Sequence, residues 1–253
     1  MENSDKIREH CLYKEWMSLQ EQELSQLLNR SLNLNKTTAD VDSDAEIGAL
    51  VDKITQHFQD YVDSRRRLAG REVSAFFSPR WCTTLENSML WIAECRPSSF
   101  FSLVYALCGA DIDKKLSQYF QGSSSEFPQL SSSQLISIDN LQRRTIAEEE
   151  KLSSRVASLQ QEMADMPLAL IARNSGPICE HNSDVRENIG KIEQAMASAM
   201  EEADQLRLNT FKELIQILKP LQAVEYIIAT KNFDFVFSRG EWRETMSMVG
   251  TRW

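Results

Sequence analysis

Residues 189–221, IGKIEQAMASAMEEADQLRLNTFKELIQILKPL, carry the spacing of apolar residues that decides the fold class. Apolar or small side chains, with one threonine, recur there at steps of three and four residues. This spacing places them in one stripe along a long α-helix. The positions are Ile189, Ile192, Met196, Ala199, Ala203, Leu206, Thr210, Leu214, Ile217 and Leu221. Pro220 has no amide hydrogen to donate, so we expect the helix to kink or restart there.

A second long helix precedes this one. We expect it to begin at Ser133 and to reach Met166, just before Pro167. Its seam has the same heptad-like spacing, at Leu152, Val156, Leu159, Met163 and Met166. A loop of roughly a dozen residues separates the two helices, which favours an antiparallel hairpin. The seam can serve the chain's own core, a homodimer, or both.

The first half of the chain also reads as helical. Only 8 glycines and 6 prolines occur among 253 residues, which argues against a β-sandwich or barrel. The apolar face expected for the first helix is Ile7, Cys11, Trp16, Leu19, Leu24, Leu27 and Leu28. We expect helices at Ser4–Asn29, from Ser43 or Asp44 to Phe77, at Leu85–Cys95 with Thr84 as N-cap, from Ser98 or Ser99 to Cys108, and at Asp111–Phe120.

The predicted fold class is therefore all-α. We expect a multi-helix bundle with two long antiparallel helices in the C-terminal half and a single helical domain over residues 1–253. A serine-rich connector at residues 121–133 separates the two halves.

Charge and composition exclude several classes of function. The formal net charge of −9 repels phosphate backbones, so we expect no direct binding of nucleic acid. The longest strongly apolar stretch, Phe100–Cys108, is too short to span a bilayer. Five scattered cysteines without a CxxC motif fit a reducing, intracellular compartment. We interpret a short basic cluster as a solvated helix face paired with nearby acids: Arg65, Arg66, Arg67 and Arg71.

No catalytic motif is present in the sequence. There is no HExxH, GxSxG, P-loop or GxGxxG pattern, and we predict that the chain is not an enzyme and holds no metal. The histidines are isolated from other metal ligands, and we interpret His57 as a structural residue with a satisfied hydrogen bond. Glu148–Glu150 lie on a long helix, where a solvated outer face is the default interpretation.

Aromatic residues gather at two places. Tyr13, Glu15 and Trp16 form a compact YKEW segment near the N-terminus, where a core role and an interface role are both open. The second group surrounds a predicted helix break at Arg96-Pro97, and we interpret it as core: Trp81, Trp91, Phe100, Phe101 and Tyr105.

These segments resemble the plant Delay-of-Germination (seed dormancy control) family. YKEWMSLQ at residues 13–20 is similar to the N-terminal motif of that family. Trp81, then LEN at 85–87, LWI at 90–92, CRPSSFF at 95–101 and LVYALCG at 103–109 resemble its central signature. The resemblance runs from about residue 13 to residue 242. A related domain forms the C-terminal part of TGA-type bZIP factors, but this chain has no basic region and zipper, so it resembles the stand-alone branch.

The resemblance implies a regulator of seed dormancy, germination and abscisic-acid signalling, present in nucleus and cytoplasm, that acts through protein–protein interaction. Its implied partners are clade A type 2C protein phosphatases and a second copy of itself. Tyr13, Glu15 and Trp16 would lie at the phosphatase-binding surface. Cys11-Leu12 stands where the best-known pattern has Asp-Ser.

The sequence leaves two other functions open. One is a transcriptional co-regulator that associates with bZIP factors. The other is a small-ligand sensor for a lipid or haem, with a cavity lined by Met196, Met200, Met246 and Met248. The resemblance ties haem binding to two histidines, whose positions here are Val236 and Gly240. Neither residue can ligate iron, so we expect no haem by that route and no other cofactor.

Overall fold

The computed structural model describes residues 2–34, 41–109, 130–165 and 183–238. Within these residues every regular element is a helix and no β-strand occurs. This confirms the predicted all-α fold class. The elements are α1 (Glu2–Leu34), α2 (Val41–Ala69), α3 (Ser74–Phe77), α4 (Thr84–Met89), a helix at 99–109, α6 (Ser132–Met163), α8 (Ser183–Ile217) and α9 (Pro220–Ser238).

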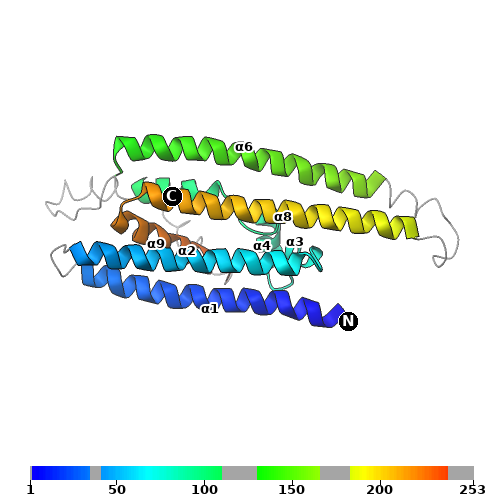
Figure 1. Ribbon diagram of the computed structural model, residues 1–253, viewed down its shortest axis with the longest axis horizontal. Coiled ribbons are helices and arrows are strands. Elements are labelled where there is room, and N and C mark those ends of the chain that lie inside the picture. Colours follow the sequence, from blue (N-terminus) through cyan, green and yellow to red (C-terminus); the bar gives the residue numbers. More distant parts are fainter. Residues whose placement is uncertain (1, 35–40, 110–129, 166–182, 239–253) are drawn as a thin grey trace, which may run out of the picture.

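The long helices lie side by side along the length of the molecule (Figure 1). α6 and α8 run in opposite directions and pack along each other, so the predicted antiparallel hairpin is confirmed. The other side of α8 packs on α2, while α1 and α9 pack on α2 and on each other. None of the described helices is long and apolar enough to cross a membrane.

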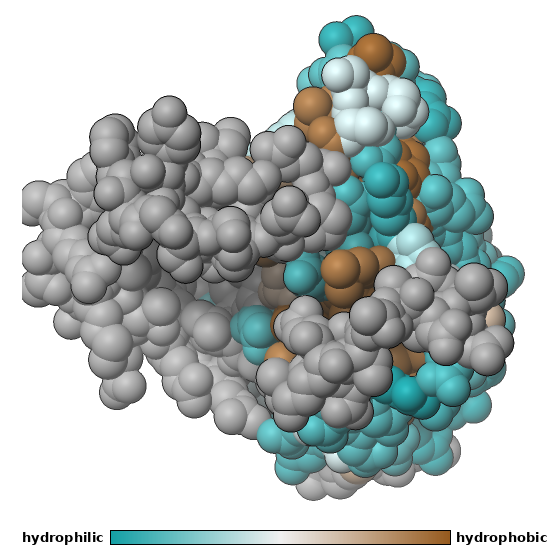
Figure 2. Space-filling model, turned by 90° about the vertical axis from the view of Figure 1, so that its left-hand side faces the viewer, coloured by the Kyte–Doolittle hydropathy of each residue, from teal (hydrophilic) through white to brown (hydrophobic). Residues whose placement is uncertain are grey.

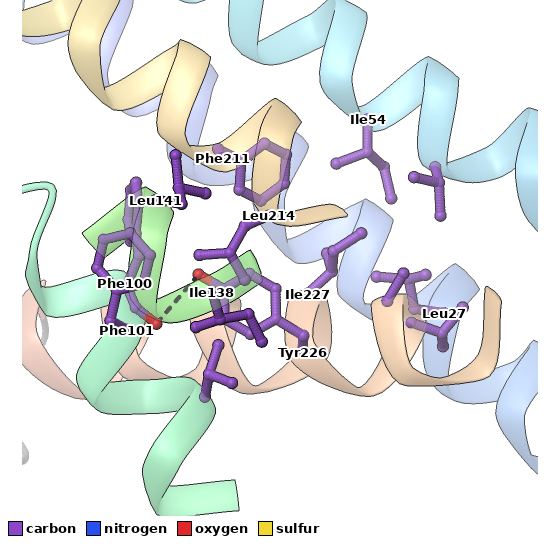
Figure 3. Packing of buried hydrophobic residues seen from close by; sticks show 14 of the residues in the cluster. Leu27, Ile54, Phe100, Phe101, Ile138, Leu141, Phe211, Leu214, Tyr226 and Ile227 are labelled. Carbon is purple, nitrogen blue, oxygen red and sulfur yellow. Dashed lines mark hydrogen bonds between the residues drawn. The ribbon is translucent and has the colours of Figure 1, made fainter. Parts of the chain in front are cut away.

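The main hydrophobic core lies where α1, α2, the helix at 99–109, α6, α8 and α9 meet (Figure 3). Phe101, Ile138 and Leu214 are fully buried there, and the Tyr226 hydroxyl donates to the Phe100 carbonyl at 3.5 Å. A second cluster joins α2, α3, α6 and α8 and includes Phe76 and Met200. Seen from one end of the molecule, the surface of the described residues is mostly hydrophilic with a few apolar patches (Figure 2).

Some of the predicted helix boundaries are confirmed and others are wrong. α9 begins at Pro220, as expected from the missing amide hydrogen. α6 begins at Ser132, after Ser131 forms a capping box with Gln134, so the last two residues of the 121–133 connector belong to this helix. The predicted helix at Asp111–Phe120 lies outside the described residues.

The second helix is shorter than predicted. α2 ends at Ala69 and not at Phe77, and Gly70 and Arg71 make turn hydrogen bonds back to Arg66 and Leu68. Glycine is a poor residue for continuing a helix, which explains the break. α3 then forms a separate single turn.

The predicted helix at Leu85–Cys95 is also shorter, because α4 ends at Met89. Its N-cap is Thr83 and not Thr84. The Thr83 hydroxyl accepts the Glu86 amide at 3.2 Å, and the Glu86 carboxylate accepts the Thr83 amide. After Met89 the chain turns through Ile92 and Ala93, which both have positive φ angles of 45° and 66°.

Candidate functional site

The inner face of α1 differs from the predicted one. Four residues at helical spacing are buried on it: Glu9, Gln20, Glu23 and Leu27. Tyr13 and Trp16 lie on the same face and are half-buried, whereas Cys11 is exposed and Leu28 is 44% exposed. α1 therefore packs through a largely polar and aromatic face.

The structure separates the three predicted site residues. Tyr13 stacks on Trp81 with ring centroids 5.5 Å apart, and Trp16 stacks on Tyr61 at 4.3 Å. Glu15 lies on the exposed side of α1. A partner-binding role for these residues remains a prediction, but only Glu15 of the three is fully available at the surface.

Trp16 also lines a partly open cavity between the helices. The cavity has a volume of about 80 Å³ and lies between α1, α2, α8, α9 and the segment before the helix at 99–109. Its lining combines aromatic and aliphatic side chains with charged ones: Trp16, Gln20, Ile54, Phe58, Tyr61, Val62, Arg65, Glu94, Cys95, Phe100, Asp204, Arg207, Phe211, Ile227, Thr230 and Lys231.

A buried ion pair between α1 and α9 lies beside the cavity, and its lysine, Lys231, lines it. The Lys231 ammonium donates to the Glu23 carboxylate and to the Gln20 side-chain oxygen, both at 2.6 Å. The other Glu23 oxygen lies 2.5 Å from Nδ1 of His57 on α2. The prediction of a structural histidine at position 57 is confirmed, and the network joins α1, α2 and α9.

Two buried arginines that share one carboxylate also line the cavity. Asp204 of α8 accepts from Arg65 of α2 at 2.9 Å and from Arg207 at 2.6 Å. Arg65 also pairs with Glu94 at 3.0 Å. Burial alone would favour the neutral form of Arg65, but the Asp204 and Glu94 carboxylates raise its pKa above the ordinary value. The interpretation of Arg65 as a solvated residue is therefore wrong.

These arginines hold the loop that follows α4. Arg207 donates to the carbonyls of Trp91 at 2.5 Å, Ile92 at 3.0 Å and Cys95 at 2.7 Å. Arg65 donates to the Ala93 carbonyl at 3.1 Å. The loop carbonyls thus accept hydrogen bonds from guanidinium groups in place of helix amides. These bonds compensate for the energetic cost of two non-glycine residues in the left-handed region.

The same loop is tied to α6. The Trp91 indole donates to the Ser153 hydroxyl at 2.9 Å and lies over the guanidinium groups of Arg96 and Arg207. Glu149 accepts the Ser98 amide at 2.5 Å and pairs with Arg96 at 3.2 Å. Glu149 is only 2% exposed, so its predicted place on a solvated face is wrong. Burial raises the pKa of this carboxyl above its usual value, despite the opposing contacts with Ser98 and Arg96.

Two further predictions can be compared with the structure. Met200 packs in the second core cluster and Met196 against it, and neither lines the cavity, which is aromatic. Met246 and Met248 lie outside the described residues. Val236 lies in α9, while Gly240 and His181 lie outside the described residues. Across the described ranges, no group of three or more His, Cys, Asp or Glu side chains is arranged to hold a metal ion.

The cysteine chemistry of the described residues can be tested directly. Burial, with the nearby Glu86 and Glu94 charges, raises the pKa of the Cys82 thiol to about 12. Thiolate is the reactive form, and at pH 8 a thiol with this pKa is almost entirely protonated. We expect iodoacetamide to label the exposed Cys11 within minutes and Cys82 at least about a hundred-fold more slowly. Peptide mass spectrometry measures both rates, and equal labelling would contradict the assigned environment of Cys82.

Comparisons with known proteins give a consistent result. Residues 19–106 match the family model described as DOG1, seed dormancy control. The chain is 34% identical over 249 residues to protein DOG1-like 3 of Arabidopsis thaliana, covering 94% of this chain and 84% of that protein. It is 29% identical to the Arabidopsis protein RESPONSE TO ABA AND SALT 1 over 63% of each chain. It is also 23% identical to the Arabidopsis transcription factor TGA5, covering 81% of this chain and 58% of that protein.

Proposed function

The chain belongs to the DOG1 seed-dormancy-control family, and from this premise we propose that it is a non-enzymatic regulator of seed dormancy and of the response to abscisic acid. It acts by binding other proteins, in the nucleus and the cytoplasm. The nearly full-length similarity to a DOG1-like protein supports the assignment to this biology. The partner we propose is a clade A type 2C protein phosphatase.

The proposed binding surface is the outer face of α1, and the packing of this helix supports that choice. Its inner face is fixed by buried polar contacts and by the rings of Tyr13 and Trp16. Its outer face leaves Glu15 exposed, with Cys11 and Ser18 one turn to either side. The exposed carboxylate of Glu15 is available for a charged contact with a partner. Glu15 contacts the phosphatase directly in this proposal, while Tyr13 and Trp16 act as positioning residues.

A charge reversal on the outer face tests this arrangement. Glu15→Lys should weaken binding to a purified clade A type 2C phosphatase by at least about ten-fold, because it replaces a contact by a repulsive or unpaired charge. Pulldown at graded phosphatase concentration measures the change. Glu150→Lys, at an exposed position of α6, makes the same change of charge away from α1; it is the matched control and should bind like the wild type. Wild-type binding by Glu15→Lys would place the interface elsewhere.

Association with bZIP transcription factors is a second candidate function, favoured by the similarity to TGA5. The charge of −9 supports docking onto such a factor in preference to direct DNA binding. Co-purification of the tagged chain from seed extract separates the candidates, since the phosphatase proposal expects a type 2C phosphatase as the captured protein. Neither candidate requires haem, and with Val236 and Gly240 at the histidine positions we propose none by that route. Self-association remains a further proposal.

A further inference from the structure

The cavity between α1, α2, α8 and α9 has the features of a ligand site, and this goes beyond the proposed binding of a phosphatase. We propose that it binds a small, neutral, ring-shaped molecule that carries one hydroxyl group. Three properties of the cavity lead to this chemical class, namely its walls, its balance of charge and its size.

The walls favour a flat ring. Aromatic side chains from four parts of the chain surround the space: Trp16, Phe58, Tyr61, Phe100 and Phe211. Phe211 meets Phe58 edge-on with ring centroids 5.6 Å apart, and Trp16 stacks on Tyr61. Ile54 and Val62 complete the apolar part of the lining. Rings bind well between such surfaces, because offset stacking and edge-to-face contacts are both available.

The balance of charge favours a neutral molecule. Three cations line the cavity, and each already has a carboxylate within 3.0 Å. Lys231 pairs with Glu23, while Arg65 and Arg207 share Asp204 and Arg65 also contacts Glu94. A charged ligand would have to break one of these pairs or remain buried without a counter-charge, and both are unfavourable.

The size favours a single substituted ring. A cavity of about 80 Å³ is smaller than the roughly 150 Å³ cavity that accommodates benzene, so it can take no more than one small ring. A polar contact is available at the α9 end, where Thr230 lines the cavity. Its hydroxyl donates to the Tyr226 carbonyl at 2.9 Å, so the oxygen can still accept a hydrogen bond from a ligand.

Four probes of similar size test the proposal on the wild-type chain. Benzyl alcohol is a neutral ring, benzoate an anionic ring, benzylamine a cationic ring at pH 7, and 1-heptanol a neutral chain. Saturation-transfer NMR and calorimetry should give benzyl alcohol a Kd on the order of 1 mM or tighter and at least about ten-fold weaker binding for the other three. The proposal is overturned if benzoate or benzylamine binds as tightly as benzyl alcohol, if 1-heptanol does, or if no probe binds.

A pair of variants locates the binding site. Val62→Leu adds a methylene group inside the cavity and should weaken benzyl alcohol binding by at least about five-fold. Val104→Leu makes the same change beside a different, smaller pocket and should leave binding unchanged. Equal affinity in Val62→Leu and the wild type would overturn the assigned location. The probe series uses only the wild type, so it decides the proposal even if a variant fails to fold, and it is independent of any phosphatase.

Discussion

Replacing Asp204 by alanine is expected to lower the free energy of unfolding by about 3–5 kcal/mol. Asp204 is 3% exposed and is the carboxylate shared by Arg65 and Arg207. Without it, the Arg207 guanidinium stays buried at 1% exposure against backbone carbonyls and the Trp91 ring. Removing one partner of a buried ion pair is far more destabilising than the net stability of the pair suggests, because the other charge is left buried. Urea denaturation followed by circular dichroism measures the change.

The same helix offers the matched control. Glu213 of α8 pairs with Arg144 of α6 at 2.8 Å, but these side chains are 44% and 66% exposed. Glu213→Ala should therefore change the free energy of unfolding by no more than about 1 kcal/mol. If Asp204→Ala were as mild as Glu213→Ala, the buried arginine cluster could not be what holds the loop at residues 91–95.

Replacing Lys231 by methionine should be the second large effect, at about 3 kcal/mol. Methionine keeps much of the length of lysine but removes the ammonium group that neutralises Glu23. Glu23 then remains buried at 2% exposure, and among the described residues it keeps only Gln20 and His57 as polar contacts. Because the pair joins α1 to α9, we also expect faster hydrogen exchange in α1, which mass spectrometry measures.

A double variant distinguishes the contribution of the ion pair to stability from the separate contributions of its two side chains. Glu23→Gln combined with Lys231→Met removes both charges, so its stability should return to within about 1–2 kcal/mol of the wild type. Additive losses in the double variant would show that the two side chains contribute independently and would contradict the ion pair as the link between α1 and α9.

The seam and the long helices could be predicted because apolar periodicity is a local property of the sequence. Ala199, Ala203 and Leu214 are all fully buried, as the heptad-like spacing of residues 189–221 predicts. The restart at Pro220 follows from the chemistry of one residue. These features need no knowledge of what lies across the helix interface.

The inner face of α1 could not be predicted in the same way. Periodicity arguments assume that apolar residues point inward, but Glu9, Gln20 and Glu23 are buried while Cys11 is exposed. Gln20 and Glu23 are buried because Lys231, more than two hundred positions later in the sequence, meets them at 2.6 Å. No local pattern contains this information. Trp16 was identified from its residue type, but its stacking on Tyr61 depends on the same long-range arrangement.

The prediction for the loop after α4 was wrong for a related reason. Residues 85–95 have the composition of a helix, yet the chain leaves the helix at Met89. Arg65 and Arg207 bind the carbonyls of Trp91, Ile92, Ala93 and Cys95. These contacts compensate for the energetic cost of two non-glycine residues in the left-handed region. Nothing in the sequence around the two arginines indicates that they are buried. Their burial follows from the ion pairs that both make with Asp204 in the folded chain.

We propose that this chain regulates by binding a phosphatase through the outer face of α1, and isothermal titration calorimetry with the two purified proteins measures that binding. We expect saturable binding of a clade A type 2C phosphatase to the wild-type chain, with a Kd on the order of 1 μM or tighter. Under the same conditions Glu15→Lys should bind at least about ten-fold more weakly. No detectable binding by the wild-type chain, or equal affinities for the two, would contradict this proposal.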